Sequence, residues 1–481
     1  MVTTQTDPSF DALYVISDLH MGGVEGFQIF GAGPLLGQTI DQLRDTLPEQ
    51  EIGLVINGDT VDFIAEPKAE YFDPVGAVDK LNRITSDPAF KPVWNALTRF
   101  VRTPKRTLLI NLGNHDLELA LPRVKERLLQ ILTGGDTDLR GRIRLVFDGT
   151  GVCCRVGNAS VLCLHGNEVD NWNICDYESL RRQGKDLHFN ADREPWIPNA
   201  GTQLVVDVMN QIKRKYPFVD LLKPELEAVV PTLYALDPSL RPKLANVFGV
   251  AKRWAKDTLR RSTGFLESAR DIEEPGDSQQ DLEALLVSTL IADRPSDGST
   301  VETPQTKGAG SLEGLESTRG AVDALTGLIQ RQPKHEILRR AMEGLTENRG
   351  FRFDEPDDTF RKTDELVGKG VDFLVTGHTH MHRAHPRSRE GFYFNSGTWV
   401  RLIQLSPEVL RDTEKFKRYY DAFEHGTMSA LDNEPGMILN RPTVVSICSR
   451  GSRVEGSLCN ATQVDSGIEL TTLDDTTFTV G

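Results

Sequence analysis

The chain has 481 residues, of which 38% are hydrophobic and 26% are charged, and its formal net charge at pH 7 is −15. This length exceeds one average domain and the composition is ordinary for a soluble globular protein, so we expect one large domain with an insertion, or two domains. The acidic balance disfavours tight, sequence-independent binding of duplex nucleic acid by the whole surface, although a local basic groove stays compatible with it.

The first residues and the cysteines indicate a cytoplasmic protein. Residues 1–10 are polar and lack the basic and apolar regions of a signal peptide, and no run of about eighteen apolar residues could form a transmembrane segment. The six cysteines form no Cys-x-x-Cys pair. Several lie in strand-like apolar segments, where a reduced, buried thiol is the plain interpretation.

Apolar runs in the first part of the chain predict three strands, over residues 12–17, 53–57 and 107–110. Such continuous runs are typical of buried strands in a parallel sheet. Helical spacing over 39–47 and 90–101, and a helix that begins at Pro122, complete an alternating α/β pattern.

Each of these strands ends in residues that can bind a metal ion. The three segments are Asp18-Leu19-His20, Gly58-Asp59 with Asp62, and Gly113-Asn114-His115-Asp116. Open α/β sheets bind their ligands at the carboxyl ends of strands. Asn114 offers a neutral oxygen, His115 an imidazole, and Asp116 a carboxylate that can orient that imidazole.

Between Arg142 and His165 the hydrophobic pattern alternates with period two, and glycine-containing turns divide it into three short strands. We expect this meander to belong to the second sheet of a two-sheet sandwich. It ends in His165-Gly166, a fourth strand end with a possible metal ligand.

The long segment between His165 and His378 is far more than a loop needs. Residues 171–265 are predicted to be mostly helical, and they carry more Lys and Arg than Asp and Glu. Two interpretations stay open: a solvated helical face, or a cap whose basic face meets an anionic substrate. Residues 266–320 have the composition of a disordered linker around one short helix.

A helix near 320–347 leads to a predicted strand over 371–375, which ends in Gly377-His378-Thr379-His380. The elements expected after it are a strand and turn over 391–399, a helix near 407–423, and strands over 443–448 and 453–458. The predicted domain organisation is a core in two parts (1–170 and 321–465), a helical cap (171–265), a linker (266–320) and a polar, frayed tail (466–481).

Asp, Asn and His gathered at several strand ends suit a divalent transition metal better than Ca²⁺, which prefers shells made only of oxygen. For any single histidine the default interpretation is a buried structural residue. Five such motifs in order, each after a strand-like run, favour a metal site.

The order of the motifs, D-x-H, G-D-x-x-D, G-N-H-D, H-G and G-H-x-H, resembles that of the calcineurin-like metallophosphoesterase superfamily and extends from residue 14 to about residue 400. The resemblance implies an α/β/β/α sandwich of two sheets, here with a large helical insertion. It also implies two divalent metal ions with a shared carboxylate. The implied ligands are Asp18, His20, Asp59 and His380 for one ion, and Asp59, Asn114, His165 and His378 for the other.

The implied reaction is hydrolysis of a phosphoester or pyrophosphate bond, in which two cations clamp the phosphoryl oxygens and acidify a water molecule. His115 would contact a phosphate oxygen or protonate the leaving group, with Asp116 fixing its tautomer. Asp62 stands where purple acid phosphatases carry Tyr, which argues against a charge-transfer Fe(III) site. We expect Mn²⁺, with Fe²⁺, Zn²⁺ or Ni²⁺ as alternatives.

The helical segment after His165-Gly166 is similar to that of the UDP-2,3-diacylglucosamine pyrophosphatases of lipid A synthesis, on the basis of residues 165–170 and 176–182. Those enzymes carry Arg where this chain has His115, and they are far shorter. We expect Tyr177, Arg181 and Arg182 to bind substrate, because arginine can grip a phosphate by two parallel hydrogen bonds.

The expected substrate is a phosphorylated small molecule, or a nucleotide or lipid diphosphate. One alternative is a nuclease resembling the repair exonucleases of the same superfamily, which the acidic balance and the lack of basic and aromatic interleaving disfavour. The other is a non-catalytic scaffold, as in the retromer subunit of this fold. Such scaffolds lose metal ligands, whereas every ligand position is filled here. Peripheral membrane contact and oligomeric state stay open.

Overall fold

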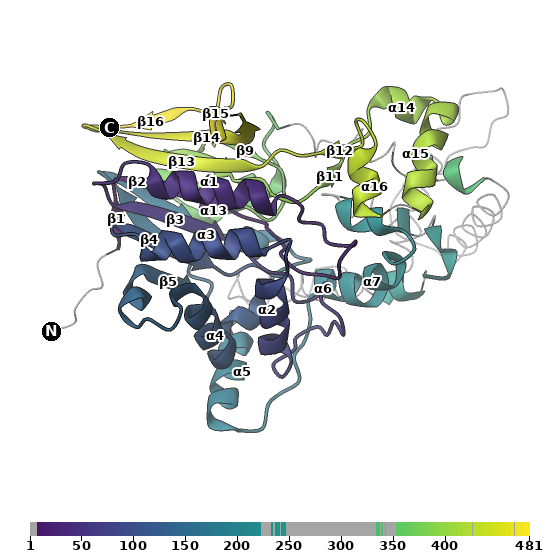
Figure 1. The fold of residues 1–481 in the computed structure, drawn as a ribbon, viewed down its shortest axis with the longest axis horizontal. Coiled ribbons are helices and arrows are strands. Elements are labelled where there is room, and N and C mark those ends of the chain that lie inside the picture. The colour runs from purple at the N-terminus through teal and green to yellow at the C-terminus, as the bar shows by residue number, and fades with distance from the viewer. Residues whose placement is uncertain are drawn as a thin grey trace, which may run out of the picture.

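The computed structural model describes residues 7–222 and 353–481, apart from 426 and 466, and short pieces between 232 and 246 and between 333 and 342. The predicted linker (266–320) and most of the helices predicted between 223 and 352 lie outside the described residues. Figure 1 shows a core built on β-sheets, with a smaller helical lobe beside it. None of the described helices is long and apolar enough to cross a membrane.

The larger sheet of the core runs in the order β15-β14-β13-β2-β3-β4-β5, and β16 also pairs with β14. Its strands are β2 (Ala12–Ile16), β3 (Ile52–Asn57), β4 (Arg106–Asn111), β5 (Ile143–Val146), β13 (Thr443–Arg450), β14 (Arg453–Val464), β15 (Gly467–Thr472) and β16 (Phe478–Val480). The strands from β2 to β5 are parallel neighbours, so their carboxyl ends meet at one edge of the sheet.

The smaller sheet runs in the order β1-β6-β7-β8-β10-β9. Its strands are β1 (Ser9–Phe10), β6 (Val152–Val156), β7 (Ala159–Cys163), β8 (Phe373–Thr376), β9 (Arg383–Pro386) and β10 (Phe392–Asn395). The predicted meander of three strands in this sheet is wrong. Of the three predicted strands, β6 and β7 form a hairpin in the smaller sheet, whereas β5 pairs in parallel with β4 in the larger sheet.

Helices cover the outer face of each sheet. The helices on the larger sheet are α1 (Gly33–Asp45), α2 (Ala77–Ser86), α3 (Lys91–Arg102) and α4 (Pro122–Thr133), and α13 (Asp358–Val367) lies on the smaller one. Along β2, Tyr14 packs in the cluster that contains these four helices, while Leu13 packs between the two sheets. On the far side, Phe360 of α13 packs with Leu374 and Tyr393. The predicted α/β/β/α sandwich is confirmed.

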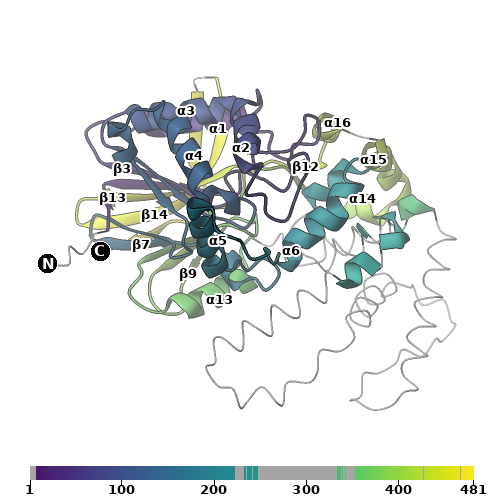
Figure 2. The ribbon, with the colours of Figure 1, turned by 90° about the horizontal axis from the view of Figure 1, so that it is seen from below.

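Two distant segments share the apolar core of a second lobe, which comprises residues 200–222 and 402–439 and the short described pieces. Its elements are α6 (Ala200–Gln203), η4 (Leu204–Met209), α7 (Asn210–Ile212), η5 (Pro217–Leu221), η6 (Pro238–Leu240), β11 (Leu402–Ile403), α14 (Pro407–Arg411), α15 (Thr413–His425), α16 (Met428–Asn433) and β12 (Ile438–Leu439). Buried Phe218 packs with Phe416 and Phe423. The two views place this lobe at one end of the core (Figures 1 and 2).

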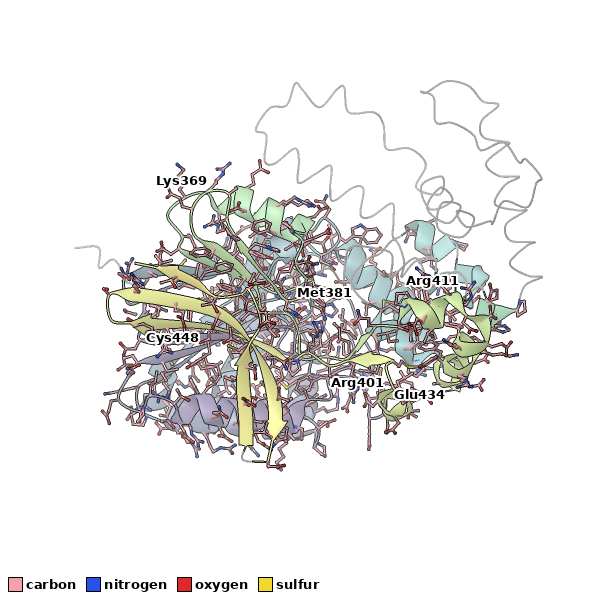
Figure 3. The ribbon with its side chains drawn as sticks, turned by 90° about the horizontal axis from the view of Figure 1, so that it is seen from above. Lys369, Met381, Arg401, Arg411, Glu434 and Cys448 are labelled. Atoms are coloured by element: carbon pink, nitrogen blue, oxygen red, sulfur yellow. The ribbon has the colours of Figure 1, made fainter. Side chains whose placement is uncertain are left out.

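Side-chain contacts attach the second lobe to the core. Arg401, which lies where the chain passes into the lobe (Figure 3), pairs with Asp432 at 2.6 and 2.7 Å and donates to the carbonyl of Gln28. The Tyr71 hydroxyl donates to Asp207 at 2.8 Å.

The C-terminal tail differs from the frayed segment that its polar composition predicts. Residues 467–472 and 478–480 form β15 and β16, which pair with β14. The tail is ordered because its few apolar side chains are partly buried: Ile468 and Leu470 pack on the core of the larger sheet, and Phe478 stacks on Phe392 with ring centroids 4.5 Å apart.

Candidate metal centre

The strand-end motifs converge because β2, β3 and β4 are parallel neighbours in one sheet and β7 and β8 are parallel neighbours in the other. Among the groups of their side chains that could hold a metal ion are a first group, Asp18, His20 and His380, and a second group, Asp18, Asp59 and His165. All of these residues are buried, and in each group the ligand atoms lie within 4.8 Å of one another.

The backbone at five of the expected ligands is left-handed. Their φ angles are 54° for Asp18, 44° for His20, 50° for Asp59, 69° for His378 and 64° for His380. Residues other than glycine rarely adopt this conformation. Each instance costs about 1–3 kcal/mol and persists only where the surroundings impose it. Its concentration here favours a functional site over a set of structural histidines.

Two motif glycines permit the close approach of these side chains. A Cβ at Gly113 would lie 2.1 Å from Asp59 Oδ1, and one at Gly58 would lie 2.2 Å from His165 Nδ1. Any side chain at either position would displace a candidate ligand.

The first group is centred on Asp18. His380 Nε2 lies 3.5 Å from Asp18 Oδ1 and 3.2 Å from His20 Nε2. His20 Nδ1 donates to Asp62 at 3.2 Å, so the His20 nitrogen left for a metal is Nε2.

Asp59 joins the first group to the second. Its Oδ2 lies 3.4 Å from His20 Nε2 and 3.2 Å from His165 Nε2. His165 Nδ1 donates to the carbonyl of Asn57 at 2.8 Å, so Nε2 is the nitrogen that meets Asp59. One buried carboxylate oxygen therefore lies close to a histidine of each group, and Asp18 belongs to both groups.

Buried polar atoms without a hydrogen-bond partner indicate whether a cation fits this site. Asn114 Oδ1 and His165 Nε2 are buried and have no hydrogen-bond partner, an arrangement that costs stability unless something compensates it. In a neutral His165 ring, Nε2 carries a lone pair that faces the lone pairs of Asp59. A divalent cation between such nitrogen and oxygen donors would satisfy them, so the residues fit a metal ion.

Without a metal, a proton on His165 takes the place of the cation between His165 and Asp59. Burial lowers the pKa of His165, but the adjacent Asp59 carboxylate outweighs it and raises the pKa to about 10. Burial opposes ionisation of Asp59, yet the neighbouring imidazoles, His165 foremost, hold its pKa well below its ordinary value. Metal binding at neutral pH would therefore displace a proton from this pair.

His378 lies beside the second group, with its ring centroid 5.3 Å from that of His165. Its Nε2 pairs with Asp170 at 2.8 Å, which leaves Nδ1 for a ligand role. Its backbone N–H donates to Asp18 Oδ2 at 3.0 Å. The structure thus brings both histidines of the last motif to the other candidate ligands.

His115 pairs with Asp62. The sequence analysis named Asp62 as a residue that can bind a metal ion and not as the partner of His115. His115 Nδ1 lies 3.1 Å from Asp62 Oδ2, the same oxygen that holds His20 Nδ1. Burial alone would raise the pKa of Asp62, but His115 and His20 hold it well below its ordinary range. The sequence signal for Asp62 was its position as the second Asp of the G-D-x-x-D motif. These three side chains also form a group that could hold a metal ion.

Asp116, expected to orient the ring of His115, has both oxygens occupied by backbone. They accept the N–H groups of Thr60 and Gly113, each at 2.7 Å. Burial, and then the Asp59 charge, raise the pKa of Asp116 to about 8. Asp116 therefore fastens two motif loops, while Nδ1 of the adjacent His115 is held by Asp62.

The candidate substrate-binding residues lie on α5 (Tyr177–Phe189). Arg181 and Arg182 are exposed and pair with Glu178 at 2.8 and 3.0 Å. Tyr177 lies against Gly149, and burial raises the pKa of its hydroxyl well above the ordinary value. No contact described for these side chains reaches a candidate metal ligand, so their role in substrate binding stays a prediction.

Comparison with known proteins connects this geometry to a family. Residues 12–222 match the family model of the calcineurin-like phosphoesterases. The matched range contains Asp18, His20, Asp59, Asn114 and His165, and the fold adds His378 and His380 from beyond it. No curated protein matches the chain.

Proposed function

Because residues 12–222 match the family model of the calcineurin-like phosphoesterases, we propose that this chain hydrolyses phosphoester or pyrophosphate bonds with two divalent metal ions, Mn²⁺ being the first candidate. The observation that carries the proposal is Asp59, whose Oδ2 lies 3.4 Å from His20 Nε2 and 3.2 Å from His165 Nε2. A carboxylate shared by two ligand groups is what a two-metal site requires.

The proposed ligands are those that the resemblance to the metallophosphoesterases implies. One ion would be held by Asp18, His20, Asp59 and His380, and the other by Asp59, Asn114, His165 and His378. When bound, two such ions withdraw charge from the phosphoryl oxygens and make a water acidic enough to attack phosphorus at neutral pH.

His115 is proposed to act on the substrate and not to bind metal. Its side chain is 14% exposed, whereas that of His20 is 1% exposed. Asp62 holds Nδ1, and Nε2 is the nitrogen proposed to contact a phosphoryl oxygen or to donate a proton to the leaving oxygen.

The test is metal removal and return in the purified full chain. We expect the chelator-stripped protein to be inactive on bis-p-nitrophenyl phosphate. Added Mn²⁺ should restore hydrolysis, because the chain itself supplies the donor groups proposed to hold the ions. Nucleotide sugars and single-stranded DNA, assayed alongside, separate a pyrophosphatase from a nuclease. A chain that binds Mn²⁺ but hydrolyses none of these would contradict the proposal and favour the scaffold alternative.

A further inference from the structure

The turn that follows His165 contacts three of the ligands proposed for the second ion. It comprises residues 168–173, which continue from η3 (Asn167–Val169), and is called here the ligand clamp. Glu168 Oε1 accepts the backbone N–H of His165 at 3.3 Å. Asp170 Oδ2 pairs with His378 Nε2 at 2.8 Å. Asn173 Oδ1 accepts from Asn114 Nδ2 at 3.4 Å.

The clamp fixes which atom each ligand presents. An amide donates only through its nitrogen, so the contact with Asn173 directs the Nδ2 of Asn114 away from the metal position and leaves its buried, unpartnered Oδ1 as the ligand atom. In the same way, Asp170 occupies Nε2 of His378 and leaves Nδ1.

The clamp is itself a connected unit. Asn173 Nδ2 donates to Asp170 Oδ2 at 2.7 Å, and the backbone N–H of Trp172 donates to Asp170 Oδ1 at 2.9 Å. The carbonyl of Trp172 accepts the backbone N–H of Gly201 in α6 at 2.8 Å. Asp170, Asn173 and the start of the second lobe therefore form one hydrogen-bonded chain.

Other residues hold the ligands of the first ion. His20 is fixed by Asp62 at 3.2 Å, and the carboxylate of Asp18 accepts the Ser17 hydroxyl. The side-chain supports of the two groups of ligands are thus separate, although the groups share Asp59 and the backbone N–H of His378 donates to Asp18 Oδ2 at 3.0 Å.

We propose that Asp170 and Asn173 are positioning residues that set the affinity of the second metal position separately from the first. This inference rests on the proposed two-metal function. Partners that hold metal ligands in place typically change metal affinity about 10–100-fold when they are removed. The clamp then governs how readily the second ion is loaded.

The test is a calorimetric titration of Mn²⁺ into the chelator-stripped full chain. We expect two binding events in the wild type. Asp170→Ala and Asn173→Ala should weaken one of them about 10–100-fold and leave the other unchanged. Asp170→Asn should lie between, because its amide oxygen can still accept the His378 N–H. Asp62→Asn, which alters the support of His20, should weaken the other event.

Glu178→Gln is the matched control, because it removes a nearby acidic group that pairs only with exposed Arg181 and Arg182 among the described contacts. Circular dichroism establishes that each variant is folded, and if Asp170→Ala fails to fold, Asp170→Asn and Asn173→Ala decide. Unchanged affinities, or an equal loss at both events, would overturn the inference and spare the proposed function. A wild-type chain that binds fewer than two ions would overturn both.

Discussion

At the scale of single residues, Asp62 connects a proposed metal ligand to the residue proposed to act on the substrate. One oxygen of its carboxylate lies 3.2 Å from Nδ1 of His20 and 3.1 Å from Nδ1 of His115. It therefore fixes two rings with different proposed roles, a metal ligand and a group that acts on the substrate. A displacement of this single side chain would disturb both.

Replacing His115 separates these two roles. We expect His115→Ala to lower kcat about 10²–10⁴-fold, the usual contribution of a positioned proton donor or acceptor. Metal content, measured by mass spectrometry after dialysis against Mn²⁺, should equal that of the wild type. Asp62→Asn is the informative comparison, since it should lower both turnover and metal affinity. Loss of metal from His115→Ala would show instead that His115 is a ligand.

At the scale of elements, the strands of the site could be predicted from the sequence with small errors at their ends. Continuous apolar runs marked β2, β3 and β4, and the polar residues after each run marked the ligands. The pairing partner of β5 could not be predicted, because a short strand with an alternating hydrophobic pattern fits either sheet of a sandwich. The contact between Asp62 and His115 could not be predicted either, because Asp116, which follows His115 in the sequence, offers a carboxylate of the same kind.

The C-terminal strands show how packing overrides composition. Phe478 stacks on Phe392, with ring centroids 4.5 Å apart and an interplanar angle of 8°, and lies 5.7 Å from Phe394. These contacts join the last strand of the larger sheet to the smaller sheet. The order of this tail could not be predicted from its composition, because polar residues surround Phe478 and only a few apolar side chains make the contact.

We therefore expect Phe478→Ala to destabilise the core by about 1–3 kcal/mol, below the loss for a fully buried phenylalanine because this ring is only partly buried. Urea unfolding monitored by circular dichroism measures the change. Phe189→Ala serves as the control, since Phe189 is 70% exposed and its removal should have little effect. Equal stability of the two variants would mean that the tail is not anchored in solution.

At the scale of the whole molecule, both halves of the chain complete one site. Residues 12–222 match the family model, yet His380 comes from the later half and lies 3.5 Å from Asp18. The second lobe repeats this arrangement, because Phe218 packs against Phe423 from beyond the insertion. The long insertion therefore does not divide the protein into independent parts. His380, from beyond the insertion, lies at the candidate metal site, and residues 200–222 share an apolar core with residues 402–439.

The central claim is that Asp59 bridges two metal ions that hydrolyse a phosphate ester, and one variant tests it most directly. Metal content and hydrolysis of bis-p-nitrophenyl phosphate should be measured together for the wild type and for Asp59→Asn, both in Mn²⁺. We expect about two ions per chain in the wild type, and one or none in the folded variant with turnover abolished. A variant that keeps both ions, or that hydrolyses the ester near the wild-type rate, would contradict the account.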